Sequence, residues 1–205
     1  MLLLVMSSNF LVMFFGWELV GLSSYLLISF WSKKPAAAKA GNKAFVINRI
    51  GDFGFLIGLM IILDTFNTFD FYKILQNTNG VAESTITSIS LFLLLGAFGK
   101  SAQFPLFSWL PDAMEGPTPA SALIHAATMV TAGVFMLVRI SPILQQSKIA
   151  SLVIIIFGLI TALLAAFSAI NQFDIKKYWL IQQFLSLDLC LLLLEQVHML
   201  LRYFI

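Results

Sequence analysis

"GAFGKSAQFPLFSWLPDAMEGPTPASALIHAATMVTAGVFMLVR", residues 96–139, places a lysine and a histidine in apolar stretches that prolines interrupt. Pro105 has no N–H, so a helix through it leaves the carbonyl four residues earlier without its partner, and the ring strains the same turn. Gly99 is expected to weaken the turn before. Within a membrane, a broken helix is tolerated only where it is buried in protein or lines water. The stretch therefore predicts a broken transmembrane helix near residues 100–105, with Lys100 at the break.

The second half of this stretch predicts a new helix that carries the histidine. Thr118 followed by Pro119 is typical of a helix start, with Thr as the N-cap and Pro at the first helical position. His125 lies about 10 Å further along this helix, and Ser121 and Thr128 share its face. A lone histidine on a helix is more often a packing residue. The hydroxyl groups and the broken helix beside it favour a proton relay instead.

The composition indicates that lipid surrounds most of the chain. Of its 205 residues, 60% are hydrophobic and 11% are charged, and the mean hydropathy is +0.94, whereas a soluble domain has about 25% charged residues. Spans in lipid must be helical, because lipid offers the backbone no hydrogen-bond partners. We therefore predict an all-α, polytopic transmembrane helix bundle. It forms a single domain, 1–205, with about six spans of membrane length, at residues 9–31, 42–64, 86–110, 118–140, 149–170 and 178–201.

Charge and cysteine content argue against nucleic-acid binding and against a disulfide or a cysteine metal site. The net charge is +2 and the basic residues are scattered, whereas nucleic-acid binding needs a clustered basic face. Cys190 is the only cysteine, so neither an internal disulfide nor a cysteine metal cluster is possible. The only histidine besides His125 is His198. We therefore expect no nucleic acid and no metal, and a lipid bilayer as the surroundings.

Five ionisable residues lie well inside the first five predicted spans: Glu18, Arg49, Asp52, Lys100 and His125. Each full charge costs about 2.5–3.5 kcal/mol at the centre of a bilayer, so such residues pair, face water or serve a function. Arg49 and Asp52 are three residues apart and are expected to form a supporting charge pair on one helix face. Glu18 and Lys100 have no such partner in their own spans and are expected to find one on another helix, with each other as a candidate pair. The charges alone fit a static salt bridge almost as well as proton transfer, and the helix break favours proton transfer.

Four stretches resemble the subunit 5 family of NADH dehydrogenases, the antiporter-like NADH-ubiquinone oxidoreductase chain 5 of respiratory complex I. They are "FLVMFFGWELVGLSSYLLISFW", "NKAFVINRIGDFG", "GAFGKSAQFPLFSWLPDAMEGPTPASALIHAATMVTAGVF" and "NQFDIKK". The resemblance covers residues 1–177, and the third stretch is highly specific. Thr131, where the related Mrp antiporters and membrane hydrogenases carry a lysine, and Gly99, which they lack, also favour subunit 5.

The resemblance implies functional roles for the matching residues. Glu18 is similar to the family's glutamate before the basic loop, Lys100 to the central lysine of the first broken helix, and His125 to the histidine that links it onward. Arg49 and Asp52 match the arginine and aspartate of "NRxGD". In the family these groups belong to a hydrated, charged axis along which protons are translocated, driven by quinone reduction elsewhere in the complex.

The sequence also departs from the family. Family members are far longer, and residues 1–8, too few for a span, are expected to be the tail of a helix. Residues 178–205 diverge into a different terminal helix, so Asp188, Glu195 and His198 receive no family role. We interpret the chain as a fragment of subunit 5 that carries the first proton-translocating bundle in residues 1–177. A degenerate structural scaffold of the same membrane arm, or a subunit of an Mrp-type sodium/proton antiporter, is the alternative.

The resemblance further implies the setting of the chain. The enzyme activity, NADH:ubiquinone reduction coupled to proton translocation, belongs to the whole complex, and this chain performs no redox chemistry. NADH, FMN, iron–sulfur clusters and ubiquinone are expected in other subunits, since the sequence has no nucleotide-binding loop and no set of cysteines. The expected partners are other membrane-arm subunits of complex I, including the chains that supply the rest of subunit 5. The expected location is the mitochondrial inner membrane, or the plasma membrane of a bacterium.

Overall fold

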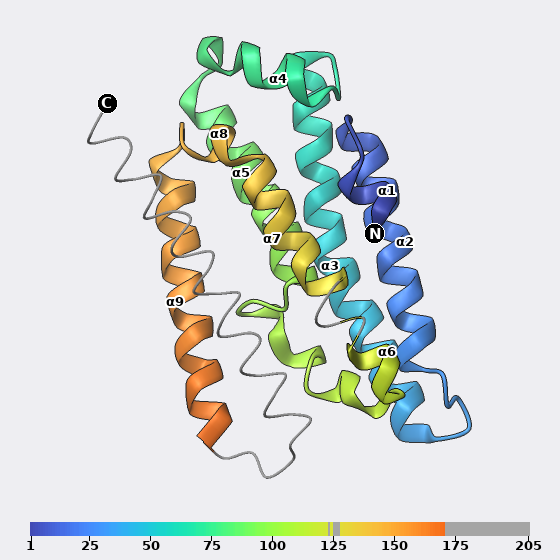
Figure 1. The fold of residues 1–205 in the computed structure, drawn as a ribbon. Coiled ribbons are helices and arrows are strands. Elements are labelled where there is room, and N and C mark those ends of the chain that lie inside the picture. Colours follow the sequence, from blue (N-terminus) through green and yellow to red (C-terminus); the bar gives the residue numbers. More distant parts are fainter. Residues whose placement is uncertain (123, 125–127, 171–205) are drawn as a thin grey trace.

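The computed structural model describes residues 1–122, 124 and 128–170, and this part of the chain is built from helices. Figure 1 shows the longer helices side by side in a bundle, with α9 at one edge. The predicted all-α fold class is therefore confirmed. In chain order the elements are α1 (Leu2–Val5), α2 (Phe10–Ile28), α3 (Pro35–Phe66), α4 (Phe71–Asn77), the 3-10 turn η1 (Thr78–Gly80), α5 (Glu83–Lys100), the 3-10 turns η2 (Leu106–Trp109) and η3 (Asp112–Glu115), α6 (Thr118–Ala122), α7 (Met129–Arg139), α8 (Ser141–Leu144) and α9 (Lys148–Ile170).

Three of the predicted spans form continuous helices that are long and apolar enough to cross a membrane. These helices are α2, α3 and α9, with 19, 32 and 23 residues, and the shortest is about 28 Å long. α3 begins at Pro35, earlier than predicted, because proline is favourable in the first turn of a helix. The spans predicted at 86–110 and 118–140 consist of shorter helical pieces. The span predicted at 178–201 lies outside the described residues.

The helix break predicted near residues 100–105 is present. α5 ends at Lys100, and Ser101 closes its last turn. Ala102 then has a φ of 50°, in the left-handed region that no right-handed helix continues through. The chain continues in the short turns η2 and η3 before α6 begins. Pro105 therefore lies within the break, as predicted.

Gly99 has a different structural role from the predicted one. It lies inside the last turn of α5 rather than in the break. A Cβ atom on Gly99 would lie 3.0 Å from the Cα atom of Gly51 on α3, and one on Gly51 would lie 2.9 Å from the Cα atom of Gly99. The two glycines therefore allow the backbones of α3 and α5 to touch, as small residues do between membrane helices. This contact brings α3 close to the end of α5, where the break begins.

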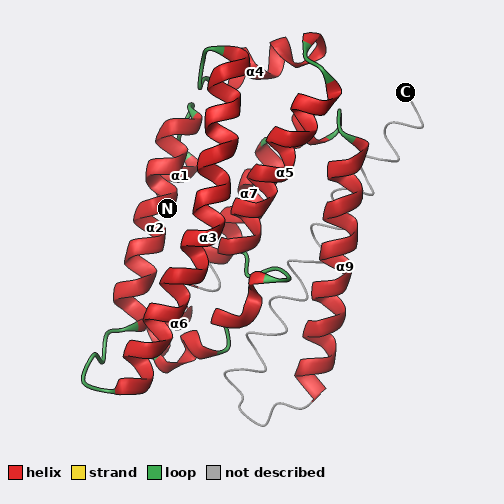
Figure 2. Cartoon of the chain, turned by 180° about the vertical axis from the view of Figure 1, so that it is seen from behind, coloured by secondary structure: helices red, strands yellow, loops and turns green. Residues whose placement is uncertain are grey.

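The polar stretch between α3 and α5 contains a short helix of its own. This helix, α4, lies across one end of the bundle, as Figure 2 shows from behind. Asp70 caps it by accepting a hydrogen bond from the N–H of Tyr72 at 3.1 Å. Asp70 also forms an isolated antiparallel bridge with Asn9, the residue before α2. The bridge joins α4 to the start of α2.

Candidate functional site

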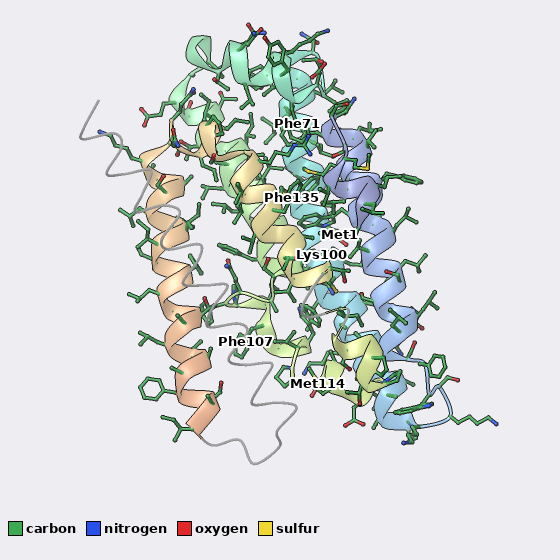
Figure 3. All side chains as sticks on the ribbon, in the orientation of Figure 1. Met1, Phe71, Lys100, Phe107, Met114 and Phe135 are labelled. Carbon is green, nitrogen blue, oxygen red and sulfur yellow. The ribbon has the colours of Figure 1, made fainter. Side chains whose placement is uncertain are left out.

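The predicted lysine at the helix break is buried in the bundle. Lys100 is the last residue of α5 and is 1% exposed. Figure 3 shows it in the interior of the bundle, near the first residues of α7. Its Nζ atom donates a hydrogen bond of 3.3 Å to Oδ2 of Asp52 on α3. Asp52 is 3% exposed. A buried ammonium therefore has a carboxylate partner on the neighbouring helix.

A second ion pair joins α2 to α3. Glu18 Oε2 pairs with Nη1 of Arg49, and the two side chains are 21% and 45% exposed. The guanidinium of Arg49 also lies over the ring of Phe45, 4.8 Å from its centroid. This pair is therefore nearer the surface of the bundle than the pair formed by Lys100.

The structure corrects the predicted pairing of these four residues. Arg49 was expected to pair with Asp52, and Glu18 with Lys100. Arg49 instead pairs with Glu18, and Asp52 with Lys100. Two residues three apart on a helix point in directions about 60° apart. Asp52 therefore faces inward, towards α5, while Arg49 reaches sideways to α2.

The four groups nevertheless form one electrostatic cluster. The carboxylate of Glu18 interacts with the charges of Asp52 and Lys100 as well as with Arg49. The ammonium of Lys100 likewise interacts with Glu18 and Arg49 as well as with Asp52. With two acidic and two basic groups, the cluster is neutral when all four are ionised. Moving a proton onto or off any one of them changes the field at the other three.

Two residues of α2, Trp17 and Gly21, also lie against Asp52 and Lys100. Neither was predicted from the sequence. The indole Nε1 of Trp17 donates a hydrogen bond of 2.8 Å to Oδ1 of Asp52. Gly21 lies directly against the ammonium, because a Cβ atom on it would meet Nζ of Lys100. The signal in the sequence was their spacing: residues four apart share a helix face. The indole of a tryptophan also carries an N–H donor, which usually finds a partner when it is buried.

The backbone around the break is held by hydrogen bonds from side chains. Nε1 of Trp109 donates to the carbonyl of Gly99 at 3.2 Å, one of the carbonyls that a helix end leaves without an intrahelical partner. The hydroxyl of Ser101 donates to the carbonyl of Val130, at the start of α7, at 2.9 Å. The end of α5 is thereby tied both to η2 and to α7.

The remaining predicted site residue, His125, lies outside the described residues. α6 begins at Thr118, within one residue of the predicted start. Of the residues on the predicted polar face, Ser121 is buried and its hydroxyl donates to the carbonyl of Pro117 at 3.3 Å. The role of His125 as a relay stays a prediction. Asp188, Glu195 and His198 also lie outside the described residues.

The chemistry available in this cluster is the binding and exchange of protons. Carboxylate, ammonium and guanidinium groups carry no redox function, and proton relay is one of the functions that buried ionisable groups serve in membrane proteins. Within the described ranges, no group of three histidine, cysteine, aspartate or glutamate residues is arranged to hold a metal ion. The expectation that the whole chain binds no metal stays a prediction.

Comparison with known proteins gives the family. Residues 7–179 match the family described as "NADH:quinone oxidoreductase/Mrp antiporter, TM". The chain is 54% identical over 189 residues to NADH-quinone oxidoreductase subunit L of Neisseria meningitidis, covering 86% of this chain and 28% of that protein. It is 55% identical over 177 residues to NADH-ubiquinone oxidoreductase chain 5 of Rhizopus stolonifer, covering 86% of this chain and 27% of that protein.

The fold is similar to that of a solved membrane complex. A chain in the structure of the Mrp complex from Dietzia sp. DQ12-45-1b superposes with a TM-score of 0.89 and 30% identity, covering 95% of this chain and 21% of that one. The chain therefore spans less than a third of the length of these relatives. It is a multi-pass membrane protein, with charged residues of α2, α3 and α5 gathered beside a broken helix. The chain belongs to the transmembrane family that NADH:quinone oxidoreductases share with Mrp antiporters.

Proposed function

We propose that this chain is a proton-translocating segment of the membrane arm of a complex I-type NADH:quinone oxidoreductase. The observation that carries the proposal is the buried pair of Lys100 and Asp52 at the end of α5, where the helix breaks. A static salt bridge needs no break in the helix, whereas a break gives water and exposed backbone groups access to a buried site. The relatives named NADH-quinone oxidoreductase subunit L and NADH-ubiquinone oxidoreductase chain 5 support the assignment.

The residues of the cluster have distinct parts in this function. Lys100 holds the transferable proton, and Asp52, 3.3 Å away, stabilises its charged form. A change in their separation alters the proton affinity of the ammonium, because Coulomb interactions are strong where water is excluded. Glu18, paired with Arg49, exchanges protons with the neighbouring part of the axis. His125 carries the proton onward from Lys100.

The setting follows from the same proposal. NADH, FMN, iron–sulfur clusters and ubiquinone are bound by other subunits, and the free energy of quinone reduction drives the proton movement here. The partners are other membrane-arm subunits, including chains that supply the rest of the subunit, and residues 1–177 form its first translocating bundle. The membrane is the mitochondrial inner membrane, or the plasma membrane if the protein is bacterial.

The test is the proton yield of assembled complexes with a changed Lys100. Lys100→Met keeps the length of the side chain and removes its charge, so the complexes that assemble with it should oxidise NADH while translocating fewer protons per NADH. Lys100→Arg should also lower the ratio, because arginine does not release its proton at physiological pH. Lys39→Met, at an exposed position of α3, is the matched control. Parental ratios in both Lys100 variants would show that Lys100 is a structural charge and that the chain acts as a scaffold.

An Mrp-type sodium/proton antiporter is the second candidate. The observation in its favour is the superposition on a chain of the Mrp complex with a TM-score of 0.89. Identities of 54–55% to oxidoreductase subunits, against 30% to that chain, favour the oxidoreductase. The two differ in ion dependence: proton movement by the native assembly should follow NADH oxidation without sodium in the first case and require a sodium gradient in the second.

A further inference from the structure

The indole of Trp17 is joined to the buried ion pair by a hydrogen bond. Trp17 is 0% exposed, and its Nε1 atom donates a 2.8 Å hydrogen bond to Oδ1 of Asp52. The other carboxylate oxygen, Oδ2, accepts from Lys100 at 3.3 Å. The ring is held in turn by Phe55, whose centroid lies 5.2 Å away. The indole N–H and the ammonium therefore each hold one oxygen of the same carboxylate.

The space for the ammonium comes from a residue without a side chain. A Cβ atom on Gly21 would meet Nζ of Lys100, and the next nearest atom, Cε of the same lysine, would be 3.8 Å away. Among the described residues, the obstacle to a methyl group at this position is thus the tip of one flexible side chain. The face of the Trp17 ring borders the same space, with Nζ 5.9 Å from its centroid. Trp17 and Gly21 are four residues apart on α2, so they line one side of the ammonium site.

We propose that Trp17 and Gly21 are positioning residues for proton transfer, holding the Asp52 carboxylate and the Lys100 ammonium in one relative geometry. Trp17 fixes the rotation of the carboxylate by holding Oδ1, so that Oδ2 alone faces the lysine. Gly21 leaves the space in which the ammonium reaches Oδ2. This inference rests on the proposed function, since it concerns the same pair, and it adds α2 to the elements that control the pair.

The physical need for such positioning arises from the crowding of charges. Among the described residues, the charged groups that interact with the Lys100 ammonium are Asp52 and Arg49 from α3 and Glu18 from α2. A carboxylate free to rotate could share both oxygens with the lysine or turn towards the arginine, and either change would alter the proton affinity of the lysine. An indole N–H is a donor only, so it fixes the carboxylate without becoming a competing proton acceptor.

The experiment uses the assembled complex in vesicles and measures protons translocated per NADH oxidised as a function of pH. Trp17→Phe removes the donor and keeps an aromatic ring. The loss of a hydrogen bond to a charged group changes a proton-binding equilibrium about tenfold, which is about one pH unit. We expect the variant to assemble, with the pH profile of pumping displaced by about one pH unit and the ratio lowered. Trp31→Phe, at a half-exposed tryptophan under Lys34, is the matched control and should keep the parental profile.

Gly21→Ala tests the second half of the proposal without touching the indole. The added methyl group displaces only the end of a flexible side chain, so the complex should assemble while the ratio falls and the pH profile moves. Gly80→Ala is the matched control, because a Cβ atom there would meet no atom of the described residues within 4 Å.

The outcomes separate this inference from the proposed function. If Lys100→Met lowers pumping while Trp17→Phe and Gly21→Ala keep the parental ratio and pH profile, the two α2 residues are not positioning residues and the proposed function stands. If Lys100→Met itself pumps like the parent, the proposed function is wrong. A failure of both α2 variants to assemble, when both controls do, would mean that the residues serve packing alone and would overturn the positioning role.

Discussion

At the scale of single residues, the ion pairs within the described residues join different elements rather than residues of one helix. The ammonium of Lys100 is 1% exposed and contacts Asp52 of α3. Removing one member of a buried ion pair leaves the other charge without compensation, which costs far more than the pair itself contributes. The identity of the partner therefore decides which double substitutions restore stability.

We expect Asp52→Asn to destabilise the assembled subunit by about 3–5 kcal/mol, because Lys100 keeps a buried charge without its partner. Combining it with Lys100→Met should recover at least half of the lost assembly, since no buried charge then remains in the pair. The yield of assembled subunit after purification is the measurement.

The matched control is the pair expected from spacing alone. Asp52→Asn combined with Arg49→Gln should give no recovery, because Arg49 pairs with Glu18 in the structure. If the assembly yield recovers with Arg49→Gln and does not recover with Lys100→Met, Asp52 pairs with Arg49 on its own helix, and the structure is contradicted.

At the scale of helices, the contact between α3 and α5 depends on glycines. Gly51 and Gly99 face each other at the closest point of the two helices, where an added Cβ atom would lie 2.9–3.0 Å from the opposing Cα. Backbone atoms cannot move aside as the end of a side chain can. The distance between the two helices, and with it the reach from Asp52 to Lys100, is therefore fixed by the absence of side chains.

We expect Gly99→Ala to separate α3 from α5 and to destabilise the bundle by about 1–3 kcal/mol, the usual cost of overpacking. Gly58→Ala is the graded comparison, because its Cβ atom would lie 3.2 Å from the Cδ2 atom of Leu93, the end of a flexible side chain. The fraction of subunit retained in the complex after heating measures the difference. Equal retention in the two variants would show that the contact at Gly99 tolerates a methyl group.

At the scale of the whole molecule, one arginine joins the end of α7 to the beginning of the chain. The guanidinium of Arg139 donates to the carbonyls of Val5 and Ser7 and lies 4.3 Å from the ring centroid of Phe71 on α4. Three segments far apart in the sequence therefore meet at the side chain of Arg139.

Arg139→Gln should weaken this junction by about 1.5–3 kcal/mol, the usual value of hydrogen bonds to a charged group. Arg139→Lys should recover only part of the loss, because an ammonium cannot reproduce the planar fork that reaches two carbonyls. Protease cleavage within residues 1–8 of the assembled subunit is the measurement, and cleavage should rise in both variants. Lys73→Gln on α4 is the control, and parental resistance in Arg139→Gln would contradict the role of the arginine.

The helical fold, the membrane setting and the break after Lys100 could be predicted from the sequence alone. These follow from local chemistry: a continuous apolar span can only be helical in lipid, and Pro105 cannot continue a helix. The sequence also identified Glu18, Arg49 and Asp52 as charges inside spans, because each costs free energy there.

The pairing of these charges, in contrast, follows from the tertiary packing of the helices. Partner choice depends on how each helix is rotated about its axis and how closely its neighbours approach, and residue spacing along one helix contains neither quantity. For this reason Arg49 pairs with Glu18 rather than with Asp52. The same rotation of α2 turns Trp17 and Gly21 towards the buried pair, where a tryptophan acts as a hydrogen-bond donor and a glycine provides the space for an ammonium group.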